Sequence, residues 1–226
     1  MISVPEFMLD KNWPSQQYMV DRSFHEMLVF NITGVDPFAI KYCTKNGSTT
    51  IRKIHYNLYK PSHYTSDYNK YTQLVTEGVL EIIKFPAADK SLPLYCFYRD
   101  PIERFISASN FSIKYIKNRQ ADWLKPNNIN DMIQFIFEYK IYQETSPYGW
   151  DIFWPQTLFL GEKENYAETY NIKYINDFFK LRNINVNELG SEKTNSPKIF
   201  CKEQISTENL NILKNIYSID YEWDWY

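Results

Sequence analysis

The sequence predicts an α/β protein with a central, mainly parallel β-sheet flanked by helices. Short apolar runs at 38–43, 79–85 and 94–98 are typical of buried strands. The first and the last of these runs each lead, within a few residues, into a helical pattern. No stretch rich in Gly, Ser or Pro divides the 226 residues. We therefore expect a single domain over 1–226, in which 1–26 forms a peripheral N-terminal segment.

The stretch at 94–108 is predicted to be a buried strand that ends at Arg99 and turns directly into a helix. Asp100 is a good N-cap, because its carboxylate can accept a free N–H of the first helical turn. Pro101 then occupies the first helical position, where its missing N–H costs nothing. Glu103 follows three residues after the cap and can complete a capping box.

Arg104 and Ser107 are three residues apart, so they share one face of this helix. A guanidinium and a hydroxyl near a helix N-terminus suit a phosphate group, because free N–H groups and the helix dipole favour an anion there. The alternative is a capped helix that carries two surface arginines, Arg99 and Arg104. Taken alone, these residues are compatible with both interpretations.

A second strand-to-helix junction begins with the predicted strand at 38–43. A small polar loop at 44–50 follows it, with the sequence Thr-Lys-Asn-Gly-Ser-Thr-Thr. Apolar residues then recur at helical spacing as far as Tyr59. An Asn46-Gly47 pair between apolar runs is also the strongest short signal for a β-hairpin. A hairpin and an anion-binding loop are therefore equal alternatives at this point.

An anion-binding loop has a physical basis in these residues. Gly47 allows a close approach to the backbone. Hydroxyl groups follow at Ser48, Thr49 and Thr50. The new helix supplies free N–H groups and the positive end of its dipole, and Lys45 adds a mobile positive charge. The classical phosphate loop, with Gly, four residues and Gly-Lys-Ser/Thr, is absent.

Together the two junctions resemble sulfotransferases that use 3′-phosphoadenosine 5′-phosphosulfate (PAPS). Arg-Asp-Pro-x-x-Arg-x-x-Ser at 99–107 is similar to the family's 3′-phosphate motif, and 44–50 is similar to its 5′-phosphosulfate loop, commonly Pro-Lys-x-Gly-Ser-Thr. Thr44 departs from the usual Pro, and Ser109 stands where an aromatic residue is usual. The resemblance covers roughly 37–221 and looks closest to carbohydrate sulfotransferases.

The resemblance implies a P-loop-like three-layer fold whose two junctions bind one nucleotide. The loop would bind the 5′-phosphate and the sulfate, and the second motif would bind the 3′-phosphate. The product nucleotide would be adenosine 3′,5′-bisphosphate, and the reaction would require no metal. The implied cofactor ligands are Lys45, Asn46, Gly47, Ser48, Thr49, Thr50, Arg99 and Ser107.

The catalytic residues that the resemblance implies are Lys45 and His63. Lys45 would stabilise negative charge on the leaving oxygen, while a general base must take the proton of the acceptor hydroxyl. His63 follows Lys45 by 18 residues (63 minus 45), near the place where related enzymes carry their base. The alternative for His63 is an exposed loop histidine, and His55, Glu77 and Glu81 are further candidates for the base.

An aromatic loop at 147–156 contains Trp150, Phe153 and Trp154. These rings either fill the core or stack on a substrate ring. Its second half resembles an Asp-x-His-Trp-x-Pro-Gln-like segment of related enzymes, with Phe153 in place of His. Further predicted strands lie at 27–32, 157–160 and 173–175, and further predicted helices at 101–117, 131–143 and 176–181. A last helix is predicted with its N-cap at Ser206. It ends in a Tyr-x-x-Asp-Tyr pattern at 217–221 that resembles the end of the family's C-terminal helix.

Composition narrows the possible partners. The net charge of −2 argues against a general nucleic-acid binder. The 3 cysteines imply no disulfide framework and favour a reducing compartment. We find neither a signal peptide nor an apolar stretch that could span a membrane, so we expect a cytoplasmic protein. The residues indicate no oligomeric state.

The leading functional hypothesis is therefore transfer of a sulfuryl group from PAPS to a hydroxyl-bearing acceptor, for which a carbohydrate is the expected class. One alternative is a non-catalytic carbohydrate-binding protein that uses exposed aromatic rings, since aromatics make up 18% of the chain. Another is a nucleoside-phosphate kinase, which would require Mg²⁺ and the absent Gly-Lys-Ser/Thr loop.

Overall fold

The computed structural model describes residues 26–59, 82–84, 92–118, 128–143, 151–161, 163–186 and 199–222. These residues form two compact units, each with its own apolar core. The sheet unit comprises the described residues of 23–98 and 159–193, and the helical unit comprises those of 99–158 and 194–225. The chain passes from the first unit to the second between Tyr98 and Arg99, at one of the predicted junctions.

The sheet unit contains five strands: β1 (Glu26–Phe30), β2 (Phe38–Lys41), β3 (Ile82–Lys84), β4 (Leu94–Tyr98) and β5 (Glu168–Asn171). Their order in the sheet is β3-β1-β2-β4-β5. The β2–β4 and β4–β5 pairs are parallel, whereas β1 is antiparallel to both β2 and β3. All the strands except β1 therefore point the same way, which confirms an α/β protein with a mostly parallel sheet.

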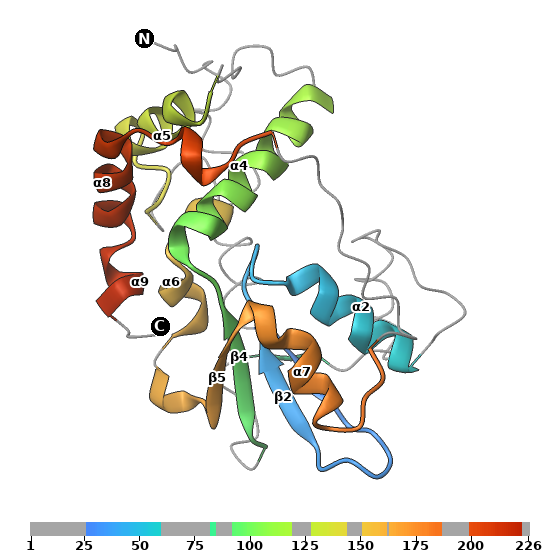
Figure 1. The fold of residues 1–226 in the computed structure, drawn as a ribbon. Coiled ribbons are helices and arrows are strands. Elements are labelled where there is room, and N and C mark those ends of the chain that lie inside the picture. The colour runs from blue at the N-terminus through green and yellow to red at the C-terminus, as the bar shows by residue number, and fades with distance from the viewer. Residues whose placement is uncertain are drawn as a thin grey trace. The chain divides into compact units, whose positions relative to one another are not determined.

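Alternation along the strands places two sets of side chains on the two faces of the sheet. On one face, α2 (Ser48–Tyr59) and α7 (Ile175–Lys180) pack against the strands (Figure 1). The intervening residues Met27, Val29 and Ala39 form a separate buried cluster. The core beneath the two helices includes Leu28, Phe30, Phe38, Ile40, Ile51, Ile54, Phe97, Phe178 and Phe179.

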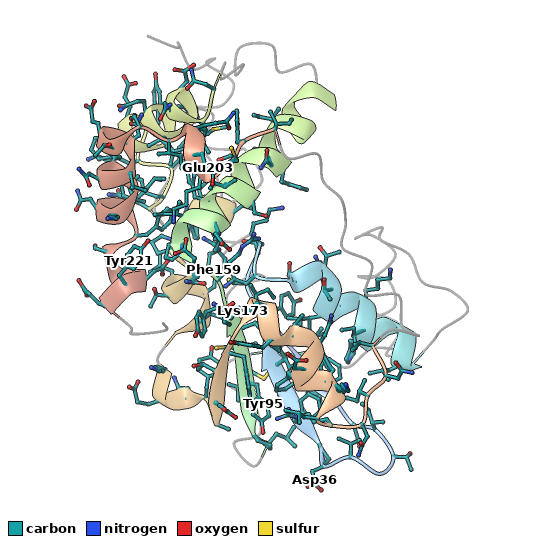
Figure 2. The ribbon with its side chains drawn as sticks, viewed as in Figure 1. Asp36, Tyr95, Phe159, Lys173, Glu203 and Tyr221 are labelled. Atoms are coloured by element: carbon teal, nitrogen blue, oxygen red, sulfur yellow. The ribbon has the colours of Figure 1, made fainter. Side chains whose placement is uncertain are left out.

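An aromatic cluster around Arg182 holds the amino ends of the parallel strands. The Arg182 guanidinium carbon lies 3.6 Å from the ring centre of Phe178 and 4.5 Å from that of Tyr95, which Figure 2 labels. Arg182 also donates to the Phe178 carbonyl at 3.0 Å. Phe38, the first residue of β2, packs against the Phe178 ring. The loops that leave the parallel strands lie at the opposite edge of the sheet.

The helical unit is built from α4 (Pro101–Asn118), α5 (Ile129–Glu138), α8 (Thr207–Ile216) and α9 (Ser218–Glu222) (Figure 1). Its core joins these helices through buried residues such as Phe105, Met132, Ile136, Leu213 and Tyr217. Short 3₁₀ turns lie at Asp151–Phe153 (η3) and Lys202–Gln204 (η6), and in the sheet unit at Lys163–Asn165 (η4) and Ile172–Tyr174 (η5).

Two predicted strands are wrong. Residues 157–160 belong to α6 (Gln156–Leu160), because the buried Asp220 carboxylate accepts N–H groups at the start of this helix. Residues 173–175 lie in η5 and at the start of α7. The strand of this region is β5, whose largely polar sequence suits an edge strand but lacks the apolar run that predicts one.

Side-chain caps begin two helices of the helical unit, and the cap predicted at Ser206 is confirmed. Asn128 caps α5 by accepting the Asp131 N–H at 3.0 Å. Ser206 caps α8 by accepting the Asn209 N–H at 3.2 Å. Each bond satisfies one of the N–H groups that a helix leaves without an internal acceptor.

The predicted end of the second helix at 143 is wrong, because α5 ends earlier in a Schellman motif. Lys140 adopts a left-handed conformation with φ 51°. The Ile141 N–H donates to the Ile136 carbonyl at 3.0 Å, and the Lys140 N–H donates to the Phe137 carbonyl at 3.2 Å. Glycine usually occupies this left-handed position, so the Lys at this place concealed the helix end in the sequence.

Candidate functional site

The loop at 44–50, the Lys45 loop, connects β2 to α2. The hairpin alternative for Asn46-Gly47 is therefore wrong, since a helix and not an antiparallel strand follows. The turn closes where the Asn46 N–H donates to the Cys43 carbonyl at 3.3 Å. The helix begins where the Ile51 N–H donates to the Gly47 carbonyl at 2.9 Å. The observed unit is the strand, polar loop and helix that an anion-binding loop requires.

Two residues of the loop have left-handed backbones, Lys45 with φ 66° and Gly47 with φ 74°. A Cβ atom at position 47 would lie 2.3 Å from the Cδ1 atom of Ile172. Glycine is therefore required here both by its backbone angle and by its neighbour. A left-handed lysine is uncommon, and such strain tends to occur at functional sites.

The side chain of Asn46 ties the loop to the next parallel strand. Its amide Nδ2 donates to the carbonyl of Phe97 in β4 at 3.1 Å, and the residue is fully buried. Asn46 is one of the predicted cofactor ligands. In the structure its side-chain amide instead supports the loop from the sheet side.

The hydroxyl residues of the loop form the first turn of α2. Ser48 is buried, Thr50 is half-buried and Thr49 is exposed. The first N–H groups of a helix have no acceptor within it, so this turn presents N–H donors together with the positive end of the dipole. Lys45, the predicted catalytic cation, is half-buried one residue before Asn46.

Helix α2 is held firmly on the sheet. Ile51 and Ile54 are fully buried, and the ring of His55 lies 2.8 Å, through Nε2, from the Val29 carbonyl of β1. Burial lowers the pKa of His55 to about 4, although the bond to Val29 opposes this shift. A neutral ring then donates from Nε2 to the carbonyl. His55 is a structural residue and not an accessible general base.

The carboxyl end of β5 lies beside the Lys45 loop through Ile172. The following turn, η5, carries Lys173, which Figure 2 labels, with its Nζ atom 4.8 Å from the ring centre of Tyr174. Burial raises the pKa of Tyr98, and Tyr174 raises it further. Sequence reasoning missed this turn, because it predicted a strand at 173–175.

In the helical unit, the first residues of α4 form what we call the Arg99 turn (residues 99–107). Asp100 is the N-cap, as predicted: its Oδ1 atom accepts the Glu103 N–H at 2.9 Å. The Glu103 carboxylate lies 3.6 Å from Nε of Arg99. Burial lowers the pKa of the Arg99 guanidinium, and the charge of Glu103 opposes that shift. Arg99 keeps 30% of its side chain exposed.

The buried Arg104 excludes the alternative of two surface arginines. Its side chain is buried, with 1% exposure, and its Nη1 atom donates to the carbonyl of Trp154. The Arg104 guanidinium therefore does not meet Ser107 at an accessible phosphate site. Ser107 is half-buried further along α4. Ser109, at the position where the family has an aromatic residue, is buried and donates to the Phe105 carbonyl at 3.0 Å.

The side-chain amide of Gln156 forms hydrogen bonds with both backbone polar groups of Arg99. Its Oε1 atom accepts the Arg99 N–H at 3.1 Å, and its Nε2 atom donates to the Arg99 carbonyl at 2.9 Å. Sequence reasoning missed this role. Two signals pointed to Gln156: its place in the Pro-Gln segment that resembles related enzymes, and Pro155 before it, which is typical of a helix start. We predicted a strand directly after it, at 157–160, instead of a helix.

Residues of the Tyr-x-x-Asp-Tyr pattern at 217–221 hold the segment around Gln156 in place. Asp220 is fully buried, and its carboxylate accepts the N–H groups of Gln156 at 3.1 Å and of Thr157 at 2.9 Å. Tyr217 donates through its hydroxyl to the Phe153 carbonyl at 2.8 Å. Burial raises the pKa of Asp220, while Thr157 and the charge of Arg104 lower it.

The aromatic loop fills the core instead of presenting rings to a substrate. Phe153 and Trp154 are fully buried, and Phe153 packs against Phe105 with ring centres 5.7 Å apart. Of the two interpretations of these rings, the core interpretation is confirmed for both. Trp150 lies outside the described residues.

The predicted general base, His63, lies outside the described residues, as do the alternative candidates Glu77 and Glu81. None of the helices in the described ranges has the length and apolar character of a membrane span. In the same ranges, no group of three or more His, Cys, Asp or Glu side chains could hold a metal ion.

No family model matches the chain, and neither does any curated protein or solved structure. The features of the chain that indicate a function are therefore the Lys45 loop, the Arg99 turn and the motifs that they carry.

Proposed function

We propose that this chain is a PAPS-dependent sulfotransferase of P-loop-like architecture, which transfers a sulfuryl group to a hydroxyl-bearing acceptor. The observation that carries the proposal is the Lys45 loop: Asn46-Gly47 leads from a parallel strand into a helix and not into a hairpin. A hairpin would have removed the helix N-terminus on which anion binding depends.

In this proposal each junction binds one end of the nucleotide. The first turn of α2 binds the 5′-phosphate and the sulfate through N–H groups and the hydroxyls of Ser48, Thr49 and Thr50. Arg99 binds the 3′-phosphate, with Ser107 as a second ligand. Support for Arg99 comes from its position after a parallel strand and from its side chain, which is 30% exposed. Arg104 has no such role, since its guanidinium bonds to Trp154.

The proposed reaction is an in-line displacement at sulfur. The acceptor oxygen forms a new bond to sulfur while the bond between sulfur and the bridging oxygen of PAPS breaks. Adenosine 3′,5′-bisphosphate leaves, and His63 takes the proton of the acceptor hydroxyl. Lys45 stabilises the negative charge that grows on the bridging oxygen. The contribution of the protein is mainly position and electrostatics, as in phosphoryl transfer.

A carbohydrate remains the proposed acceptor class on the resemblance alone. The alternative of a carbohydrate-binding protein relied on exposed aromatic rings, and Phe153 and Trp154 are both buried. This burial removes two of the rings that favoured that alternative.

A thermal-shift titration of the full chain tests the proposal. Adenosine 3′,5′-bisphosphate should stabilise the chain by about 2.7 kcal/mol at 100 times its Kd, without any divalent cation. ATP with Mg²⁺ serves as the kinase ligand. If ATP with Mg²⁺ stabilises the chain and the bisphosphate does not, the result would contradict the proposal and favour the kinase. No shift with either nucleotide, together with a shift for oligosaccharides, would favour the binding protein.

The variant Lys45→Ala tests the catalytic step. The transfer rate should fall about 10²–10³-fold, because a positioned charge that meets the leaving oxygen is lost. Binding of the bisphosphate, which lacks the sulfate, should weaken by less than about tenfold. Lys53→Ala is the matched control, since Lys53 is a half-buried lysine further along α2. Equal transfer by Lys45→Ala and Lys53→Ala would remove Lys45 from the mechanism.

A further inference from the structure

The backbone of Arg99 is bonded as though another strand lay beside it. Both polar atoms of the Gln156 amide meet the same residue, with bonds of 3.1 Å to its N–H and 2.9 Å to its carbonyl. This is the pair of bonds that a residue in a neighbouring strand would make. Arg99 is the first residue after β4, and a side chain thus continues the strand pairing at the point where α4 is about to begin.

Gln156 is itself held in place. The residue is fully buried, and its own N–H donates to the Asp220 carboxylate at 3.1 Å. Thr157 adds two more donors to that carboxylate, its N–H at 2.9 Å and its hydroxyl. The carboxylate thus fixes the first two residues of α6 and, through Gln156, the backbone of Arg99.

The segment before Gln156 is anchored independently. Arg104 donates to the Trp154 carbonyl, and Tyr217 donates to the Phe153 carbonyl at 2.8 Å. Residues 153, 154, 156 and 157 are therefore each bonded to α4, α8 or α9 or to the residues at their ends. A side chain on so rigid a base has little freedom to release Arg99.

This rigidity matters because the Arg99 side chain is long, so that hydrogen bonds can fix only its backbone before an anion binds. A fixed backbone reduces the conformational entropy that is lost when the anion binds. It also fixes the point from which the Arg99 side chain extends, two residues before α4, the helix that carries Ser107.

We propose that Gln156 is the positioning residue of the 3′-phosphate subsite, and that its amide sets the place of Arg99 without touching the nucleotide. The inference rests on the proposed function, which assigns the 3′-phosphate to Arg99. It adds a third residue to that subsite, beside Arg99 and Ser107, and gives Asp220 a role in nucleotide selection.

The test compares adenosine 3′,5′-bisphosphate with adenosine 5′-monophosphate, which lacks the 3′-phosphate. The ratio of their two Kd values, measured by calorimetry on the full chain, isolates the Arg99 subsite. Gln156→Met should reduce this ratio about tenfold, with little change in the Kd of the monophosphate. Gln156→Glu keeps the acceptor for the Arg99 N–H and loses the donor, so it should reduce the ratio by a smaller factor.

Two further variants separate positioning from general destabilisation. Gln134→Met is the matched control, because Gln134 also makes a side-chain hydrogen bond in the helical unit, to Asn209 at 2.6 Å. It should leave the ratio unchanged even if it lowers the Tm. Arg99→Ala should abolish the preference for the bisphosphate, and adding Gln156→Met to Arg99→Ala should change the ratio no further.

The outcomes distinguish the inference from the proposed function. If the wild-type chain shows no preference for the bisphosphate, the assignment of Arg99 fails and the inference fails with it. If Arg99→Ala abolishes the preference but Gln156→Met and Gln156→Glu both keep it, the inference alone is overturned. If Gln156→Met does not fold, the ratio for Gln156→Glu decides.

Discussion

The Lys45 loop and the Arg99 turn each follow a parallel strand and each lead into a helix, yet they are built in different ways. The Lys45 loop owes its shape to its own backbone, with left-handed angles at Lys45 and Gly47 and a turn closed from Asn46 to Cys43. The Arg99 turn has an ordinary N-cap at Asp100, and its remaining support comes from segments far away in the sequence.

This difference indicates where each junction is vulnerable. A local loop is broken by a change within the loop itself, because its conformation depends on which residues tolerate a positive φ. A junction held by hydrogen bonds to distant segments is broken by changes in either partner, such as Arg104 within the turn or Asp220 far from it in the sequence.

Arg104→Met should destabilise the helical unit by about 3–5 kcal/mol. Removing the guanidinium leaves the buried Trp154 carbonyl without its charged donor and removes a positive charge that lowers the pKa of the buried Asp220 carboxylate. Urea unfolding, followed by the fluorescence of the buried Trp154, measures the loss. The double variant Arg104→Met/Asp220→Asn should recover part of the stability, and no recovery would show that the two charges act separately.

Gly47→Ala should destabilise the sheet unit by about 3 kcal/mol, which combines the cost of a left-handed alanine with that of overpacking. The overpacking arises at Ile172, whose Cδ1 atom would lie 2.3 Å from the new Cβ. Ile172→Val removes that atom. The double variant Gly47→Ala/Ile172→Val should therefore recover the stability lost to overpacking and keep the loss caused by the left-handed alanine.

Gly34→Ala is the matched control for this change. Gly34 has φ 84°, but nothing lies within 4 Å of an added Cβ, so only the backbone cost of about 1 kcal/mol should appear. Equal losses for Gly34→Ala and Gly47→Ala would contradict the close packing of the loop against Ile172.

The stability of the sheet unit should fall by up to about 3 kcal/mol as the pH falls from 6.5 to 4. His55 has a pKa of about 4 in the folded chain against 6.5 unfolded. Between these values the unfolded state binds more protons, so acid favours unfolding; above pH 6.5 the contribution of His55 is complete. Denaturant unfolding at several pH values measures the slope, which His55→Gln should flatten. An unchanged slope in this variant would assign the acid sensitivity to other groups.

Glu103→Gln should tighten the binding of adenosine 3′,5′-bisphosphate about twofold to threefold. Glu103 lies 3.6 Å from the Arg99 Nε atom and, in the proposed site, would compete with the 3′-phosphate for the same guanidinium. The effect is small because exposed ion pairs contribute less than about 1 kcal/mol. Calorimetry measures it, with Glu208→Gln in α8 as an exposed control of equal charge change. Weaker binding by Glu103→Gln would show that the carboxylate orients Arg99 instead of competing with the phosphate.

Much of the fold could be predicted from local patterns. The strands at β1, β2 and β4 and the helices α2, α4 and α7 follow apolar runs or periodicity. The caps at Asp100 and Ser206 were also predicted, because a capping side chain acts on a backbone group three residues away.

The errors occur where a distant residue overrides the local pattern. The run at 157–160 is apolar enough for a strand, but Asp220 supplies the cap that makes α6 a helix. Lys140 occupies a left-handed position because the buried Ile141 packs into the core of the helical unit. Neither interaction can be found by inspecting neighbouring residues.

The two junctions can be recognised from the sequence alone: Arg-Asp-Pro follows one apolar run, and small polar residues with Asn-Gly follow another. The packing of the folded chain adds that Asn46-Gly47 leads into a helix, that Arg104 is buried while Arg99 stays partly exposed, and that Gln156 and Asp220 support Arg99. Caps and backbone preferences act over a few residues, whereas a buried charge or amide finds its partner only when distant segments pack together.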